Sequence, residues 1–262
     1  MENKEDLSNK LSEHDFQLTI KNKQRLASNR KLLHWYSKLY DFQFSSIGDV
    51  SRARILEVGS GASPLRYFYS NVISSDIMNL DYLDIVFDAH RIDEITEIDN
   101  ESLDAITLTN VLHHLRDPLL FIKKATKKLK KGGRIIFAEP YFSVISSVIY
   151  KYLHQEPCSL NIEKPELTDA LSPLSSANIA LPYLIFFSKE HRWDEELKEY
   201  FEFSATNISF FTSLSYFVTG GMKTRIPIPL PFYKLFFQID LKVSRLFPRL
   251  AASFFVMSLT RK

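Results

Sequence analysis

The segment at residues 54–65, R-I-L-E-V-G-S-G-A-S-P-L, constrains the fold of this chain most. Its run at 55–58 is short and β-branched at two of its three apolar positions, so it predicts a buried strand. Gly59 and Gly61 follow, and because glycine has no Cβ, the backbone can turn sharply there and lie against a ligand. A helix that begins near Pro64 would add free N–H groups. Together they predict the nucleotide-binding end of a doubly wound α/β sheet.

Composition limits what the chain can be. Its 262 residues allow one large domain or one domain with an appended lobe, and 45% apolar residues suffice for a sizeable core. A net charge of +2 does not suggest a nucleic-acid binder. A single cysteine, Cys158, excludes an internal disulfide and suits a reducing cytoplasm, where we expect the protein. The polar N-terminus lacks the apolar core of a secretory signal, so we expect none, and no uncharged apolar stretch is long enough to span a bilayer.

Further strand-like runs follow the glycine turn. Residues 72–76 end in an acid, and in residues 82–90 an apolar run leads into an acid. Residues 103–115 begin with a mainly apolar run that leads to Asn110 and a histidine pair. Residues 134–139 form another apolar run that ends in an acid. Helical patterns alternate with these runs, so a mainly parallel sheet is indicated.

Helices are predicted at two places between or before the strands. Residues 32–44 are dense in aromatic side chains, and we expect a helix that packs over the sheet or over the ligand site. Asp117 caps a helix that begins at Pro118 and continues to the glycine pair at 132–133, a usual helix stop. The first 30 residues are charged and amide-rich, which indicates a frayed or loosely helical arm.

The alternation ends after residue 140. Residues 207–214 and 254–259 could supply two final strands, and the aromatic segment before them forms an insert. Residues 226–250 begin with three prolines (227, 229 and 231), which lead into apolar positions at helical spacing and four basic side chains. Such a basic amphipathic helix can lie on an anionic membrane or face a lipid-linked substrate. The favoured alternative is a helix that packs on the sheet and leaves a solvated basic face.

At this point the chain resembles the class I S-adenosylmethionine-dependent methyltransferases of small-molecule type. The resemblance covers residues 54–141: L-E-V-G-S-G-A-S is similar to the family's first motif, and S-D-I and F-D-A-H to its ribose and adenine segments. N-V-L-H-H-L-R-D-P resembles the fourth-strand signature, and L-K-K-G-G-R-I-I-F-A-E-P the approach to the fifth strand. One departure is Ser63, which replaces the third motif glycine. The resemblance implies a doubly wound, mainly parallel, seven-stranded sheet with an antiparallel last strand.

The resemblance also implies S-adenosylmethionine as the cofactor. Asp76 would hold the ribose hydroxyls, Asp88 would accept from the adenine amino group, and Glu57 would orient the amino-acid end. Acids suit this ligand because its sulfonium and amino groups are cationic. The implied cofactor-binding residues are Glu57, Gly59, Ser60, Gly61, Asp76, Ile77, Asp88, Ala89 and Asn110.

Residues for catalysis and substrate binding are less sharply indicated. His113 and His114 follow the fourth strand and have a suitable pKa for a general base, although either ring could instead pack or cap the next helix. Glu139 and Tyr141 end the fifth strand, and His154 lies in the insert, so these three are the substrate-contact candidates. No compact ligand spacing is present, so no metal site is predicted.

These observations divide the chain into four parts: an N-terminal helical cap (1–50), a cofactor-binding core (51–141), a substrate lid (142–206) and a C-terminal completion of the sheet (207–262). We expect methyl transfer to a small-molecule acceptor, either a sugar or lipid-linked glycan oxygen or a polyketide-like metabolite, with peripheral membrane contact left open. The alternatives are a non-catalytic cofactor-binding scaffold and an NAD-dependent oxidoreductase. The sequence gives no oligomeric state.

Overall fold

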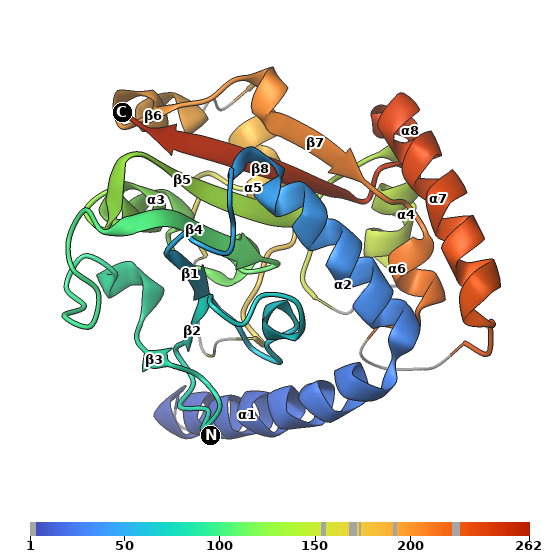
Figure 1. Ribbon diagram of the computed structural model, residues 1–262, viewed down its shortest axis with the longest axis horizontal. Helices are drawn as coiled ribbons and strands as arrows, with labels where there is room; N and C mark the ends of the chain where they lie inside the picture. Colours follow the sequence, from blue (N-terminus) through green and yellow to red (C-terminus); the bar gives the residue numbers. More distant parts are fainter. Residues whose placement is uncertain (1–3, 153–155, 168–171, 173, 191–192, 222–225) are drawn as a thin grey trace.

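The computed structural model describes residues 4–152, 156–167, 172, 174–190, 193–221 and 226–262. One mixed sheet crosses the molecule in the strand order β3-β2-β1-β4-β5-β8-β6, and β7 also pairs with β8 (Figure 1). The strands are β1 (Ile55–Val58), β2 (Ile73–Asp76), β3 (Ile85–Val86), β4 (Leu103–Thr109), β5 (Leu129–Pro140), β6 (Phe201–Glu202), β7 (Ile208–Phe211) and β8 (Phe254–Arg261).

The first five strands run parallel, and β8 runs antiparallel to β5. At the outer edge β6 and β7 pair with the same strand, β8, and the turn Ala205–Asn207 separates them. They therefore act as one interrupted edge strand. The predicted fold class is confirmed: a mainly parallel sheet with an antiparallel strand near the C-terminus, including the strands expected at 207–214 and 254–259.

Helices cover both faces of the sheet. In Figure 1, α2 crosses in front of the strands, whereas α3 and α5 lie behind them. The front core joins Trp35 and Leu39 of α2 to alternate strand residues such as Ile136, and the back core joins Phe121 of α3 to Ile135. The helices are α1 (Lys4–Ser28), α2 (Arg30–Gln43), α3 (Pro118–Ala125), α4 (Val144–Tyr152), α5 (Leu181–Phe187), α6 (Ser215–Val218), α7 (Leu230–Leu246) and α8 (Pro248–Ala251).

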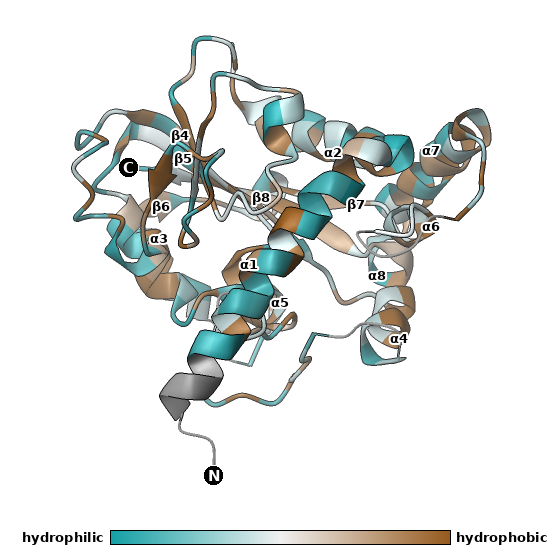
Figure 2. Ribbon diagram, turned by 90° about the horizontal axis from the view of Figure 1, so that it is seen from below, coloured by the Kyte–Doolittle hydropathy of each residue, from teal (hydrophilic) through white to brown (hydrophobic). Residues whose placement is uncertain are grey.

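Three local predictions need correction. The helix expected near Pro64 is only the 3-10 turn Leu65–Tyr67. The N-terminal arm is not frayed but forms the long regular helix α1, whose colours are mainly hydrophilic in Figure 2. The helix that begins at Pro118 ends at Ala125, and the glycine pair lies inside β5, where the pairing with β4 shifts register.

The side of α7 that faces the protein is not the one that hydropathy suggests. Its buried residues are Tyr233, Phe237, Asp240 and Ser244. The apolar side chains that should pack are instead exposed, and we call the following five the exposed stripe: Phe232, Leu235, Ile239, Val243 and Leu246. Across the described residues, no helix is both long and apolar enough to cross a membrane.

Gly133 provides a test of why the glycine pair is needed. A Cβ at this position would lie 2.9 Å from the carbonyl oxygen of Lys130 and 3.1 Å from that of Leu103. Because both atoms belong to the backbone, we expect Gly133→Ala to lower the free energy of unfolding by about 1–3 kcal/mol in urea denaturation. Gly48→Ala is the control, since no atom of the described residues lies within 4 Å of the Cβ that it would gain. Equal stability of the two variants would contradict this account.

Candidate functional site

A cavity of about 550 Å³ opens at the carboxyl ends of β1, β2 and β4. Its volume is in the range of sites that hold small molecules and cofactors. Seven of the nine predicted cofactor-binding residues line it: Gly59, Gly61, Asp76, Ile77, Asp88, Ala89 and Asn110. Glu57 and Ser60 are buried directly behind this wall.

The glycine turn has the backbone conformation that its sequence demands. Gly59 has φ +70° and Gly61 φ +47°, a region that glycine adopts readily. A Cβ on Gly59 would come within 2.6 Å of Val111, so a side chain there would collide with the loop after β4. Ser63, which replaces the third motif glycine, also has a positive φ of 55°. The departure from the motif therefore preserves the left-handed backbone.

Hydrogen bonds fix the two acids at the strand ends. Asp76 accepts from the N–H groups of Gly61 (2.9 Å) and Met78 (3.0 Å), which joins the glycine turn to the end of β2. Burial raises the pKa of Asp76. Asp88 accepts from the His90 N–H at 2.9 Å. Burial alone would raise the pKa of Asp88, but the hydrogen bonds from His90 lower it overall.

Glu57 has an unsatisfied oxygen beneath the turn. The side chain is buried, and one of its carboxylate oxygens has no hydrogen-bond partner among the residues that the structure describes. Burial raises the pKa of Glu57 to about 8, although a hydrogen bond with Ser60 opposes this. A carboxylate in this position favours a cationic group nearby. The side-chain oxygen of Asn110 is likewise buried and has no partner within the described parts of the chain, and the φ of Asn110 is +57°.

Glu139 is a structural residue, and its position does not fit the predicted substrate contact. Its side chain has no exposed surface. One oxygen accepts from the N–H groups of Val111 (2.8 Å) and Leu112 (2.7 Å), and the other lies 2.6 Å from Nδ1 of His113. The carboxylate at the end of β5 thus holds the loop after β4 in place.

Of the other two substrate candidates, Tyr141 does not line the cavity. Tyr141 is buried and packs edge-on against Tyr183, Phe187 and Phe210. His154 lies outside the described residues. The aromatic side chains expected to form the lid pack mostly in the core, because Phe186 and Phe187 contact strand residues.

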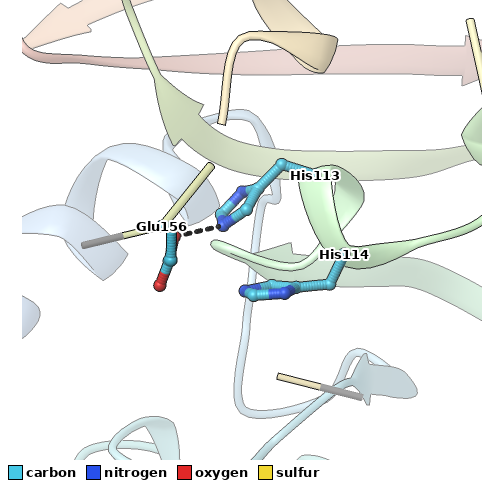
Figure 3. Close-up of side chains that lie close together, drawn as sticks. All are labelled: His113, His114 and Glu156. Carbon is cyan, nitrogen blue, oxygen red and sulfur yellow. Dashed lines mark ion pairs between the residues drawn. The ribbon is translucent and has the colours of Figure 1, made fainter. Parts of the chain in front are cut away.

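The two predicted catalytic histidines occupy different environments. His113 is buried, with Glu139 on one side and Glu156 on the other, where Nε2 is 3.4 Å from the carboxylate (Figure 3). Burial alone would lower the pKa of His113, but the two carboxylates raise it to about 10. His114 lines the cavity, and burial together with the neighbouring His113 lowers its pKa to about 4.

Sequence reasoning missed the contribution of α1 to this site. Ser12 of α1 lines the cavity together with Leu174 of the insert, residues 142–206. The two segments are joined by Asp15, whose buried carboxylate accepts from the N–H groups of Leu174 and Ser175 at 2.9 and 3.1 Å. No motif marks these residues; a buried acid in a polar helix becomes visible only once its partners are placed.

A glycine turn and acids at the ends of parallel strands, around one cavity, define an α/β protein that binds a nucleoside-type cofactor. The chain belongs to the methyltransferase domain family, whose model matches residues 21–216. It is an S-adenosylmethionine-dependent methyltransferase, as the sequence predicted, and the NAD-dependent alternative falls away. The cavity fits this cofactor, since it combines exposed glycine backbone with acids and has the unpaired Glu57 oxygen behind its wall.

Solved structures with a similar fold share little sequence with this chain. A methyltransferase from Archaeoglobus fulgidus is 14% identical, covers 86% of this chain and 99% of its own, and has a TM-score of 0.43. A methyltransferase from Thermotoga maritima is 15% identical, with 88% and 92% covered and a TM-score of 0.48. The methyltransferase CalH, in complex with SAH, is 18% identical, with 38% and 35% covered and a TM-score of 0.31. A search of curated proteins gave no match.

Glu139→Gln tests the structural role of the buried carboxylate. Both carboxylate oxygens of Glu139 accept hydrogen bonds, whereas a glutamine amide has one accepting oxygen and one donating NH₂ group. The substitution therefore leaves either the backbone N–H groups or the N–H of the His113 ring without a buried acceptor. We expect the free energy of unfolding in urea to fall by about 3 kcal/mol or more. The exposed Glu199→Gln should change it by less than about 0.5 kcal/mol. A Glu139→Gln protein as stable as the control would show that the carboxylate does not fix the loop.

Proposed function

We propose that this methyltransferase acts on a lipid-linked acceptor, with a glycan hydroxyl as the methylated group, while α7 rests on an anionic membrane surface. The exposed stripe of α7 carries the proposal. The aromatic side chains of the insert favour this acceptor over a ring-shaped, polyketide-like one, because Tyr183, Phe186 and Phe187 pack against other rings of the protein.

The cofactor roles that we propose follow the cavity wall. Gly59, Ser60 and Gly61 present their backbone to the amino-acid end of S-adenosylmethionine, with Glu57 behind them. Asp76 and Ile77 hold the ribose, Asp88 and Ala89 bind the adenine, and Asn110 lies near the methionine portion. S-adenosylmethionine supplies an activated methyl group, so the protein's task is to align the acceptor and exclude water. Because His114 lines the cavity, it is the histidine that we propose contacts the acceptor.

Asp88→Ala tests the adenine contact. Its carboxylate is 43% exposed, so its loss should spare the fold. Removing a hydrogen bond to a charged acceptor should weaken S-adenosylmethionine binding about tenfold in calorimetric titration. Asp81→Ala, an exposed acid outside the cavity, should bind the cofactor as the unchanged protein does. The adenine assignment fails if both variants bind equally well.

The exposed stripe is too apolar for a solvated helix face. Phe232 is 68% exposed, and Leu235 and Leu246 are each 62% exposed. Residues three and four apart lie on one side of a helix, so the five side chains form a continuous row. Such a row on one helix is typical of a surface that contacts a membrane or another molecule.

The charges beside the exposed stripe select an anionic membrane as the partner. Between residues 226 and 251 the one acid, Asp240, is buried and accepts four hydrogen bonds from Ser213, Leu214 and Ser215. The exposed charge of this segment is therefore positive, from Lys234, Lys242, Arg245 and Arg249. Each cation near an anionic surface contributes about 1 kcal/mol to binding.

The helices next to α7 lie at the same edge of the sheet as the cavity. Because β8 is antiparallel to β5, its start lies beside the carboxyl end of β5, where Tyr141 donates to the Ser253 carbonyl. This places α4, which follows β5, and α8, which precedes β8, at the edge where the parallel strands end. α8 packs against both α4 and α7. A membrane beneath α7 would thus lie near the side of the sheet where the cavity opens.

Replacement of the apolar row tests the membrane contact. Leu235→Gln combined with Ile239→Gln should lower the binding of the protein to liposomes with anionic lipid by about tenfold or more, because both side chains lose apolar burial. Cosedimentation with vesicles of phosphatidylcholine and phosphatidylglycerol measures it. Leu160→Gln, at a side chain 55% exposed in the insert, should bind as before. If unaltered protein fails to bind these vesicles, the membrane proposal is wrong, whereas S-adenosylmethionine binding is unaffected.

A further inference from the structure

Three side chains with metal-binding atoms meet beside the cavity. His113 and His114 come from the 3-10 turn Leu112–His114 after β4, and Glu156 comes from the insert. One potential ligand atom from each lies within 4.8 Å of the others. Figure 3 shows both imidazole rings extending from their turn toward Glu156. We call these three residues the His–His–Glu cluster.

Contacts on the outer side of each ring orient the cluster. Nδ1 of His113 lies 2.6 Å from Glu139, and Nδ1 of His114 lies 3.1 Å from the carbonyl oxygen of Ser176. A proton on Nδ1 serves both contacts. A metal ion at the two Nε2 atoms would displace the second proton, which Glu139 and Glu156 favour on His113. Metal-binding histidines typically donate their other N–H to a carboxylate or a backbone carbonyl in this way.

We infer that the His–His–Glu cluster binds a divalent transition-metal ion of the Zn²⁺ type at the wall of the cavity. Two imidazoles and one carboxylate are a ligand set that suits zinc, and three protein ligands leave a coordination position for an oxygen from water or substrate. His114 lines the cavity, so the ion would lie next to the acceptor. If the proposed function holds, this ion lowers the pKa of the acceptor hydroxyl and so favours loss of its proton to water.

The cluster also explains why sequence spacing predicted no metal. Adjacent histidines do not form a motif by themselves, and Glu156 lies in a segment far along the chain. The 3-10 turn brings the two rings to a centroid separation of 4.3 Å. The insert then places Glu156 against Nε2 of His113. The ion would therefore join the loop after β4 to the insert.

Zinc titration of the full-length protein tests the inference. Protein treated with a chelator and then dialysed should bind one Zn²⁺ per chain in calorimetry, and Co²⁺ should give the visible absorption of a tetrahedral site. His114→Ala and Glu156→Gln should each weaken Zn²⁺ binding more than about 100-fold, since second-shell changes alone cost 10–100-fold. Glu163→Gln, an exposed acid of the same insert, is the matched control and should bind Zn²⁺ normally.

Two results would overturn the inference. Absence of binding would mean that His113 simply bridges Glu139 and Glu156 by hydrogen bonds; binding that survives both cluster variants would mean a surface site elsewhere. Thermal unfolding of each variant verifies that it is folded. Retained S-adenosylmethionine binding by Glu156→Gln, without Zn²⁺ binding, supports the metal site, because the cavity is then intact. If unaltered protein binds Zn²⁺ but not anionic vesicles, the proposed function is wrong and the metal site stands.

Discussion

The buried carboxylate of Glu139 is the contact on which the geometry of the site most depends. It ends β5, yet its oxygens accept from two N–H groups of the loop after β4 and contact His113. This loop carries Val111, which occupies the space that a side chain on Gly59 would need. One buried acid therefore couples the ends of β5, β4 and β1. The carboxylate at the end of β5 fixes the loop after β4, this loop restricts the glycine turn after β1, and the loop and the turn both line the cavity. An unpaired charge there would be costly, which is why every oxygen is satisfied.

The three acids at the cavity differ in burial, and their interactions and pKa values differ accordingly. Asp76 joins the end of β2 to the backbone of the glycine turn, and Asp88 stays half-exposed with its pKa lowered. Glu57 is fully enclosed, and burial raises its pKa to about 8. A cationic ligand close by would favour the charged form. The buried acid behind the glycine turn therefore suits a cofactor that carries positive charge.

The sequence predicts those parts of the fold whose structure depends on interactions between residues close in the chain. The first strand, its glycine turn and the acids after later strands are each dictated by short-range requirements, and the structure has them at the expected places. Predictions failed where a distant partner decides. Gly133 is required by the close approach of the Leu103 and Lys130 carbonyls rather than as a helix stop. Asp15 in α1 joins the insert, a contact that no periodicity reveals.

The orientation of α7 could not be predicted from hydropathy either, because a buried polar contact determines which side of the helix faces the protein. Hydropathy alone would bury Leu235 and Ile239, but Asp240 is held by backbone N–H groups at the start of α6, and these have to be satisfied. Turning the helix to bury the apolar row would expose Tyr233 and Phe237 and leave those N–H groups unpaired. The hydrogen bonds of Asp240 therefore determine which side of α7 is buried, and the exposed stripe stays in solvent at a free-energy cost. A surface retained at such a cost, beside a basic segment and near the edge where the cavity opens, is best explained by a contact that covers it.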